Sequence, residues 1–443
     1  FTSCKQAENE TVISDSDAIE NGLLKAIQVK SDTVGTFNIL DRMEHYKVPG
    51  VSIAIVKDGK ISWAKGYGMA NTQSGTEVDT TTIFQAGSIS KPLAALAALK
   101  LVEDGTITLD EDVNTYLKDW KIPESKFTQD EKVTLRRLLT HTAGMTVHGF
   151  PGYRQTDTFP SINQVLNGKG NTPDIVVDTL PGSIWRYSGG GYTVMEKIVE
   201  DVSGLPLEVY MARNILQPLG MTNSTYEQPL GTAYHSKASA AYDTEGAIIE
   251  GLWHNYPEQA AAGLWTTPRD LATYCIAIQE ILKGKEKAVL SKQTVEAMLT
   301  KHKNDWGLGP SLRWEADSLM FGHGGKNAGF TNDMRAFATK GNAVIVMTNA
   351  DNGGKLIGEI LRAVSKHYNW GISKQRVVEI EDLSEEYLKN VTGKYKLDFQ
   401  VPDIGDYIVD LSIKDNRIVV SDPNNGETDR FAALERSKYI NLE

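Results

Sequence analysis

The sequence predicts a mixed α/β (α+β) fold, in which an antiparallel sheet is flanked by helices and carries an all-helical insertion. Alternating apolar residues around Asp58-Gly59 indicate a β-hairpin near the start. Strand-like runs return near residue 330, and a mostly helical stretch separates the two sets. Strands at both ends with helices between and after them fit one sheet covered by helices, so we expect residues 36–370 to form the main domain.

The elements of that domain follow from periodicity and from turn residues. A helix is expected over residues 36–46, and strands over 51–57 and 61–68. A helix after residues 80–84 ends near Asp104-Gly105, and the helical region 106–260 includes helices at 135–139, 193–202 and 207–216. The remaining elements are a helix over 268–281, strands over 329–339 and 343–348, and an amphipathic helix over 355–368.

The two ends of the chain differ in composition from the main domain. Residues 1–35 are acidic and polar, which is typical of a tether, and residues 371–383 form a polar linker. Residues 384–443 contain short alternating runs at 392–399, 407–413, 417–421 and 438–442, separated by turns. This pattern predicts a small C-terminal domain, either a β-meander or part of a barrel.

Composition restricts the classes of function. The 443 residues are 40% hydrophobic and 23% charged, and the net charge is −11 with no run rich in Lys and Arg. This balance argues against nucleic acid as a partner and favours a small-molecule or peptide substrate. No apolar run reaches the length of a membrane span, and two cysteines give no disulfide framework. The sequence does not indicate an oligomeric state.

The first four residues bear on localisation. Phe1-Thr2-Ser3-Cys4 resembles the end of a bacterial lipoprotein signal, in which the cysteine becomes the lipidated first residue. The alternative is that the sequence begins at an arbitrary point. The lipoprotein interpretation predicts export to the periplasm or cell surface, with a membrane tether at Cys4.

The strongest chemical signal is Ser88-Ile89-Ser90-Lys91 at the start of an Ala- and Leu-rich helix. Ser88 is suited to cap the helix, and residues three apart share a helix face, so the Lys91 amine should lie beside the Ser88 hydroxyl. Apolar flanks would lower the pKa of that amine, which makes it a better proton acceptor. A serine with its own base is therefore expected here.

A second Ser-x-x-Lys, Ser62 to Lys65, lies in a predicted strand. Odd spacing on a strand places the two side chains on opposite faces, so this copy should not act as a catalytic pair.

Two glycine-rich stretches could complete the site. Tyr187 precedes Gly189-Gly190-Gly191 and could carry a proton if Lys91 lowers its pKa; the alternative is a buried tyrosine at a loop–helix junction. His323 precedes Gly324-Gly325, and a strand edge starting here could present N–H groups to a substrate.

Other catalytic arrangements have less support. No pair of histidines has metal-ligand spacing, so neither a metal nor another cofactor is expected. No Gly-x-Ser-x-Gly motif is present, which argues against an α/β-hydrolase. His148 and Asp157 could be considered as triad partners, but nothing in their sequence context supports this.

The ordered motifs Ser88-x-x-Lys91, Tyr187-Ser188-Gly189 and His323-Gly324-Gly325 resemble those of the penicillin-recognising serine hydrolases. The chain is most similar to the class C β-lactamase-like group, which includes DD-peptidases, D-aminopeptidases and esterases. The resemblance spans about residues 36–370 and includes supporting stretches at 138–145, 218–221 and 262–267. Residues 387–395 resemble the lipocalin-like β-domain that some members carry.

The resemblance implies a β-lactamase/transpeptidase-like fold and a role for each motif. Ser88 would be acylated, and Lys91 and Tyr187 would share the proton transfers, with the identity of the base left open. The backbone N–H groups of Ser88 and Lys326 would form the oxyanion hole, with Gly189, Gly324 and Gly325 beside the substrate. His323 would stand where many relatives have lysine and supply a hydrogen bond or a pH-dependent charge.

One position departs from the family pattern. The second motif is usually Tyr-x-Asn, and the third position here is Gly189. This difference favours esters or D-amino-acid-containing peptides and amides as substrates, with β-lactam hydrolysis or DD-peptidase activity as the alternative. An alternative of another class is a sensor or peptide-binding protein that is acylated without turnover.

Overall fold

The computed structural model describes residues 14–442 except 286–288, 402–404, 416, 424–425, 427 and 436–437. Cys4 and its predicted lipidation therefore lie outside the described residues. The chain divides into two compact units: residues 40–357 form one, and the residues on either side of them form the other.

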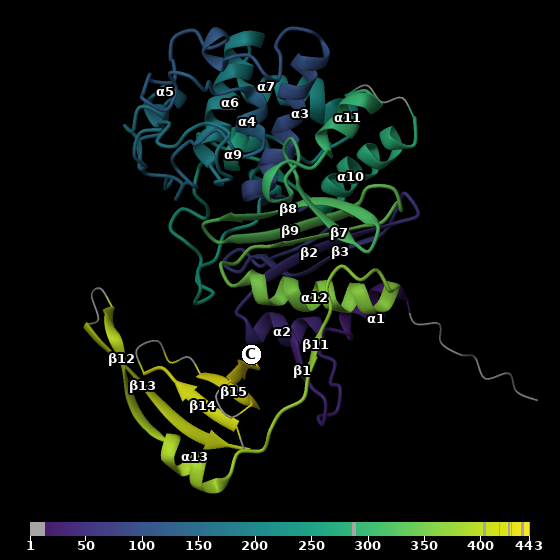
Figure 1. The fold of residues 1–443 in the computed structure, drawn as a ribbon. Coiled ribbons are helices and arrows are strands. Elements are labelled where there is room, and N and C mark those ends of the chain that lie inside the picture. Colours follow the sequence, from purple (N-terminus) through teal and green to yellow (C-terminus); the bar gives the residue numbers. More distant parts are fainter. Residues whose placement is uncertain are drawn as a thin grey trace, which may run out of the picture. The chain divides into compact units, whose positions relative to one another are not determined.

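The larger unit is built on one antiparallel sheet with the strand order β4-β3-β2-β10-β9-β8-β7 (Figure 1). The central pair is β2 with β10, which joins the beginning of the unit to its end. The mixed fold predicted from the sequence, an antiparallel sheet with helices, is therefore confirmed. The bounds are β2 Gly50–Lys57, β3 Lys60–Asn71, β4 Thr76–Glu77, β7 Ser311–Glu315, β8 Ser318–Asn327, β9 Phe330–Phe337 and β10 Ala343–Thr348.

The strands β7 and β8 differ from the sequence-based expectation. The predicted strand over 329–339 corresponds to β9, whereas His323-Gly324-Gly325 lies inside β8 and not ahead of a strand. Glycines disfavour a strand by propensity, so this one depends on its neighbours. The strand β9 pairs along all of residues 320–327, and β7 pairs only with residues 318–322, which leaves the other edge of residues 323–327 without a strand partner in the described sheet.

Helices of the insertion gather on one side of the sheet (Figure 1). The helix α3 is buried on almost every side because its residues are mainly Ala and Leu, and it packs against α6 and α9. The helix α10 packs directly on β2 and β10. The bounds are α3 Ser90–Glu103, α4 Leu135–Leu139, α5 Ile162–Leu166, α6 Gly189–Ser203, α7 Leu207–Met211, α8 Gln217–Leu219, α9 Gln259–Ala262, α10 Pro268–Leu282 and α11 Lys292–Met298.

Short turns and strands connect these helices. They include the helical turns η1 Gly87–Ile89, η2 Val113–Thr115, η3 Ala212–Leu216, η4 Thr232–Lys237 and η5 Lys303–Asp305, and the small strands β5 Phe84–Gln85 and β6 Trp265–Thr266, which pair with each other. The helix α2, Ile39–His45, precedes the sheet, and α12, Gly353–Tyr368, follows it.

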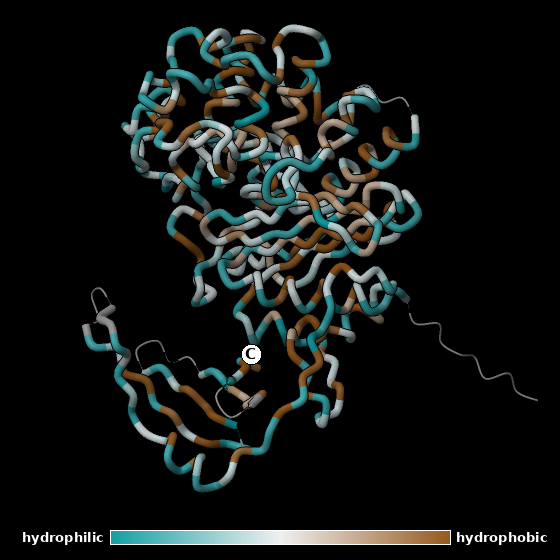
Figure 2. The backbone as a smooth tube through the Cα atoms, viewed as in Figure 1, coloured by the Kyte–Doolittle hydropathy of each residue, from teal (hydrophilic) through white to brown (hydrophobic). Residues whose placement is uncertain are grey.

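The smaller unit contains a five-stranded antiparallel meander, as the sequence predicted for the C-terminal region. Hydrophobic and hydrophilic stretches alternate along it (Figure 2). The expected runs are β12 Gly393–Val401, β13 Gly405–Lys414, β14 Arg417–Ser421 and β16 Lys438–Asn441, and β15 Thr428–Glu435 is additional. The helix α13, Glu385–Val391, precedes them.

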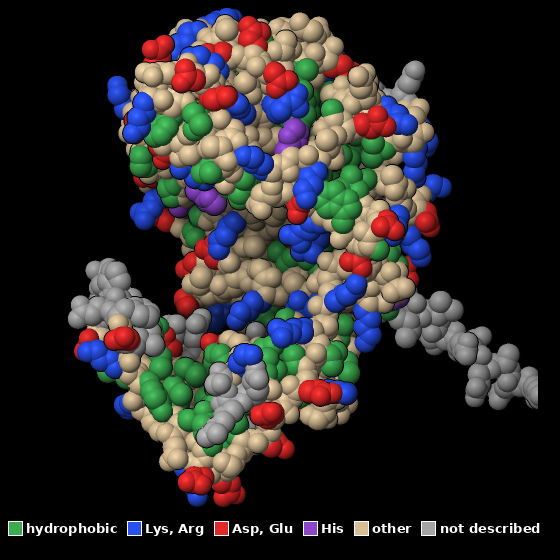
Figure 3. Space-filling model, viewed as in Figure 1, with side chains coloured by type: hydrophobic (Ala, Val, Ile, Leu, Met, Phe, Trp, Pro, Cys, Tyr) green, Lys and Arg blue, Asp and Glu red, His purple; other side chains and the backbone are tan. Residues whose placement is uncertain are grey.

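The stretches expected to be a tether and a linker contain regular structure. The helix α1, Asp15–Glu20, starts at the capping residue Ser14, and β1, Ile27–Val29, pairs in parallel with β11, Arg376–Val378. Figure 3 shows acidic and basic side chains interspersed on the visible face of the molecule. Among the described helices, none is both long enough and apolar enough to span a bilayer.

Candidate active site

Ser88 lies in the η1 turn, directly before α3. The helix begins at Ser90, and neither η1 nor α3 has a side-chain cap, so the expectation that Ser88 caps the helix is wrong. Ser90 takes the structural role instead: its hydroxyl donates to the Gly87 carbonyl at 2.6 Å and accepts from the Leu264 N–H at 3.0 Å. The Ser88 hydroxyl is therefore available for chemistry.

Lys91 is the nearest polar partner of that hydroxyl. Its Nζ lies 3.1 Å from Ser88 Oγ and donates to the Ala261 carbonyl oxygen at 2.8 Å. The remaining surroundings include the aromatic faces of Tyr187 and Tyr192, whose ring centroids are 5.0 and 5.7 Å from Nζ. The amine is held between a carbonyl, a hydroxyl and two rings.

Burial determines the protonation of Lys91. Only 2% of the residue is exposed. This burial lowers the pKa of Lys91 from 10.5 to about 7, because an ammonium ion loses its hydration and gains no carboxylate partner. A substantial fraction of the protein therefore holds a neutral amine beside Ser88 near pH 7.

Tyr187 lies just before α6, and its ring packs between two imidazoles. The centroid distances are 4.3 Å to His141 and 4.9 Å to His148. Burial raises the pKa of Tyr187 well above its ordinary value, and the nearby Ser88 hydroxyl offsets only part of this rise. The idea that Lys91 lowers this pKa is therefore not supported, because desolvation dominates, and the phenol remains protonated.

His141 fixes the backbone on which Tyr187 stands. Its Nδ1 accepts a hydrogen bond from the Ser188 N–H at 3.1 Å, so a neutral ring carries its proton on Nε2. Burial lowers the pKa of His141 well below its usual value, and the neighbouring Lys91 charge contributes. This neutral ring and its stack on Tyr187 orient the phenol toward Ser88.

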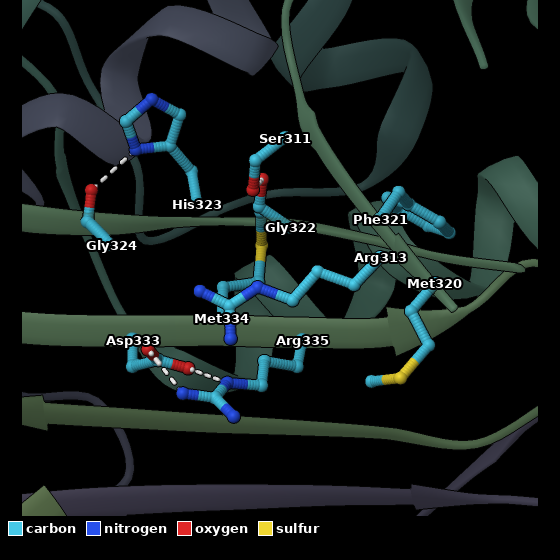
Figure 4. Close-up of a pocket in the computed structure, with 10 residues that line it drawn as sticks. All are labelled: Ser311, Arg313, Met320, Phe321, Gly322, His323, Gly324, Asp333, Met334 and Arg335. Atoms are coloured by element: carbon cyan, nitrogen blue, oxygen red, sulfur yellow. Dashed lines mark hydrogen bonds and ion pairs between the residues drawn. The ribbon is translucent and has the colours of Figure 1, made fainter. Parts of the chain in front are cut away.

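His323 projects from β8 (Figure 4). Its Nδ1 donates to the Gly324 carbonyl oxygen, which leaves Nε2 as the acceptor of a neutral ring. Burial, followed by the effect of Lys91, lowers the pKa of His323 to about 3. The expectation of a pH-dependent charge at this position is therefore wrong near neutral pH, whereas a hydrogen bond through Nε2 remains available.

Two glycines allow η1 and β8 to touch backbone to backbone. A Cβ on Gly87 would lie 2.5 Å from the Lys326 backbone nitrogen, and one on Gly325 would lie 1.9 Å from the Ala86 carbonyl oxygen. Gly87 also has a φ of +54°, which other residues rarely adopt. These positions bring the backbones of Ser88 and Lys326 together, where the family resemblance implies an oxyanion hole.

Strand geometry orients the Lys326 N–H. Asn327 and Phe330 form the hydrogen-bonded pair that closes the two-residue β8–β9 hairpin. Adjacent residue pairs in an antiparallel ladder alternate between hydrogen-bonded and non-hydrogen-bonded. The pair of Lys326 with Thr331 is therefore non-bonded, and the Lys326 N–H faces away from β9, toward η1. The Lys326 side chain is mostly exposed and has its Nζ 3.5 Å from Asp351.

Gly189 is the first residue of α6 and packs against the segment around residue 150. The family pattern has Asn at this position. A Cβ on Gly189 would lie 2.9 Å from Phe150 Cε2 and 3.1 Å from the His148 carbonyl oxygen. The His148 carbonyl also accepts the Gly189 N–H at 2.9 Å. A side chain at position 189 would therefore require Phe150 and the backbone at His148 to shift. Gly189 is buried and is not among the residues that line the cavity at Ser88, so its predicted place beside the substrate is not supported.

A cavity of about 790 Å³ opens over these groups. A much smaller one of about 20 Å³, drawn in Figure 4, lies beside it between β7, β8 and β9. The larger is the candidate active site because Ser88 lines it. It is lined by Ser88, His148, Trp185, Arg186, Tyr187, Trp306, Ser311, Arg313, His323, Gly324, Gly325, Lys326, Thr331 and Asn332.

Several lining residues were not identified by sequence reasoning. Trp306 and Arg313 fall in a stretch of the sequence where no helix or strand was expected. Only recognition of β7 as a strand could have pointed to this stretch from the sequence. His148 lines the cavity but has no triad with Asp157, whose carboxylate accepts the Arg154 N–H.

The other candidates lie outside this cavity. The second Ser-x-x-Lys lies on β3 with both side chains exposed, and a β-bulge at Ser62 interrupts the strict alternation of faces. Within the described part of the chain, no three His, Cys, Asp or Glu side chains are arranged to hold a metal.

Comparison with known proteins identifies related sequences. A family model described as Beta-lactamase matches residues 38–365. The Staphylococcus aureus protein flp is 30% identical over 230 residues, 51% of this chain and 44% of that protein. The chain thus matches less than half of that relative's length. A putative penicillin-binding protein PbpX of Bacillus subtilis is 26% identical over 368 residues, which cover 79% of this chain and 84% of that protein.

Solved structures share the fold. The octameric penicillin-binding protein homologue from Pyrococcus abyssi superimposes with a TM-score of 0.64 at 23% identity, over 91% of this chain and 93% of that one. The structure of SurE with D-Leu superimposes with a TM-score of 0.60 at 20% identity, over 91% and 89%.

Proposed function

The chain belongs to the beta-lactamase family of serine hydrolases, and from that premise we propose that it cleaves ester or D-amino-acid-containing peptide and amide bonds through an acyl-enzyme on Ser88. The observation that carries the proposal is the 3.1 Å approach of Ser88 Oγ to a Lys91 amine that burial makes substantially neutral. Such a pair provides a nucleophile and its general base.

Acylation begins with proton transfer from Ser88 Oγ to Lys91 Nζ. The oxygen attacks the substrate carbonyl carbon, and the resulting oxyanion faces the N–H groups of Ser88 and Lys326. Loss of one oxyanion donor typically lowers the rate by about a hundred- to a thousandfold. Of the two candidate bases, the structure favours Lys91, because the buried Tyr187 phenol keeps its proton.

Collapse of the tetrahedral intermediate expels the alcohol or amine. Tyr187 is suited to donate a proton to that leaving group and to regain one from Lys91, since its ring lies against Lys91 and its phenol is near the Ser88 hydroxyl. Water then attacks the acyl-enzyme, with Lys91 accepting its proton, and Ser88 is restored.

The charges around the cavity support a substrate with a carboxylate. The described lining residues include no Asp or Glu but three cations. Arg186 pairs with Asp178 and Lys326 with Asp351. The Arg313 side chain makes no ion pair or hydrogen bond with any residue that the structure describes (Figure 4). A free arginine favours an anionic group, such as the terminal carboxylate of a D-amino-acid peptide.

The test compares three substrate classes with matched variants. A p-nitrophenyl ester, a D-aminoacyl peptide with a free carboxylate and a cephalosporin are each mixed rapidly with the protein. We expect a stoichiometric burst and then steady turnover with the first two. Ser88→Ala should abolish both phases, whereas Ser62→Ala, at the exposed second motif, should retain them.

Each other outcome has a defined meaning. A burst without turnover would indicate a sensor. Faster turnover of the cephalosporin would favour the β-lactamase alternative. Full activity in Ser88→Ala, with circular dichroism unchanged, would show that the nucleophile lies elsewhere.

A further inference from the structure

One side of the active-site cavity is a wall of aromatic rings, formed by Trp185, Trp306, Tyr187 and His148, all of which line the cavity. The ring centroids of Trp185 and Trp306 are 5.5 Å apart, and those of Tyr187 and Trp306 are 5.9 Å apart. The next ring is His148, at 4.9 Å from Tyr187. The four rings therefore form one continuous surface, and it includes Tyr187, whose phenol lies near the Ser88 hydroxyl.

From this surface we infer that the protein selects substrates that carry an aromatic ring next to the scissile carbonyl. The inference rests on the proposed function, because the selected group must be attached to the acyl unit transferred to Ser88. Offset or edge-to-face packing against such rings stabilises an aromatic group beyond simple burial of its area.

The charges of the cavity argue against the main alternative ligand for an aromatic wall, which is an organic cation. A set of facing rings also binds organic cations. Here the charged side chains that line the cavity are Arg186, Arg313 and Lys326, so a cationic ligand would meet like charge. A neutral or anionic ring fits this environment better.

The part of the cavity lining that β8 contributes leaves room for such a ring. Gly324 and Gly325 of β8 present no side chains there. A Cβ on Gly324 would meet only the Asn332 carbonyl oxygen, at 3.8 Å. The cavity of about 790 Å³ therefore has space for a planar group beside the rings.

Lys303 holds the two tryptophan-bearing segments together. Its Nζ donates to the Gly182 carbonyl oxygen at 2.5 Å and to the Ser183 carbonyl oxygen at 2.7 Å. Trp185 follows Ser183 by two residues, and Trp306 follows Lys303 by three. The structure assigns Lys303 as a positioning residue that keeps Trp185 against Trp306.

The test uses p-nitrophenyl phenylacetate and p-nitrophenyl acetate, which share a leaving group. The measured quantity is the ratio of their kcat/KM values, each normalised to spontaneous hydrolysis. In the wild-type protein we expect a preference of about tenfold or more for phenylacetate, as hydrophobic-pocket discrimination typically gives. Trp306→Ala should remove most of this preference, and Trp306→Phe, which keeps a ring, should preserve it.

Lys303→Gln provides a second test that leaves all rings in place. We expect the preference to fall mainly through a higher KM for phenylacetate, because the rings remain but are less fixed, and Lys303→Arg should restore it. Lys292→Gln, on the exposed surface of α11, removes the same charge elsewhere and is the matched control. It should leave the ratio unchanged.

The outcomes separate this inference from the proposed function. If Ser88-dependent hydrolysis is absent with both esters, the proposed function fails. If both esters are hydrolysed through Ser88 without a preference, or if Trp306→Ala folds and keeps the preference, the aromatic wall does not select the substrate. If Lys303→Gln keeps the wild-type ratio and KM, the positioning role is wrong.

Discussion

Lys91 shows how a single residue can favour catalysis at the expense of stability. In the unfolded chain its amine has an ordinary pKa and is protonated at neutral pH, whereas burial in the folded protein lowers the pKa to about 7. Folding at neutral pH therefore releases a proton and opposes stability. In the proposed mechanism the same burial supplies a neutral base beside Ser88, which would explain why a lysine without a carboxylate partner is found in a core helix.

The first prediction concerns the pH dependence of catalysis. Neutral Lys91 accepts the Ser88 proton, so kcat/KM for a neutral ester should fall as the pH decreases through about 7. His323 remains neutral over this range because its pKa is about 3, so it should add no second ionisation. The measurement is kcat/KM from pH 5 to 9. A single ionisation near 10 would show that Lys91 is protonated in the active protein.

Tyr187 illustrates how neighbours define a residue's chemistry. Its sequence context suggested a proton carrier made more acidic by Lys91, but the structure places the ring between imidazoles and the amine over its face. Desolvation then dominates, and the phenol is a donor. The sequence pointed to this side chain, and the structure places it in the cavity lining, but its protonation state follows from its surroundings.

Between elements, the decisive contact is that of η1 with β8. Gly87 and Gly325 let the two backbones approach more closely than any side chain permits. This approach places the Lys326 N–H beside Ser88. Gly325 of the third motif is therefore required by the contact with η1 and not by the β propensity of its own strand, which helps to explain why β8 is a poor match to a strand pattern.

The second prediction tests this contact. Gly325→Ala would place a methyl group 1.9 Å from the Ala86 carbonyl oxygen, so η1 and β8 must separate. We expect kcat/KM for p-nitrophenyl acetate to fall by about a hundredfold or more, as for loss of an oxyanion donor. Circular dichroism and thermal unfolding check that the variant folds.

The comparison variant for this prediction is Gly324→Ala. Its added methyl group would meet only the Asn332 carbonyl oxygen, at 3.8 Å, so its effect should be much smaller. Equal losses in the two variants would mean that any side chain on this strand blocks the substrate, and that the backbone contact is not the cause.

For the whole molecule, the described site belongs to one compact unit. Every residue lining the cavity lies between positions 88 and 332, within the unit formed by residues 40–357. The C-terminal meander contributes none of the described lining residues. Its resemblance to a lipocalin-like domain, like the assignment to the class C subgroup, stays a prediction.

The third prediction follows from this division. Deletion of residues 384–443 should change kcat/KM for p-nitrophenyl acetate little, since all the described lining residues remain. Substrate access or assembly should be more affected, and a large peptide substrate compared with the small ester reports on access. A loss on the small ester as large as that of Ser88→Ala, in a folded protein, would contradict this prediction.

Local pattern predicted the elements whose periodicity is strong. The hairpin around Asp58-Gly59, the helix after Ser88 and the amphipathic helix near residue 360 all occur close to their expected positions. The strands β7 and β15 were not expected. A strand held mainly by its partners has a weak local signal, because cross-strand packing rather than propensity stabilises it.

The order and spacing of Ser88, Lys91, Tyr187 and His323 were sufficient to indicate a family and a type of chemistry, since residue type and helical spacing are local properties of a chain. Only the tertiary structure decided which charges these groups carry and which residues surround a substrate. Desolvation depends on everything packed around a group, and Trp306 and Arg313 reach the cavity through folding contacts that no short stretch of sequence encodes.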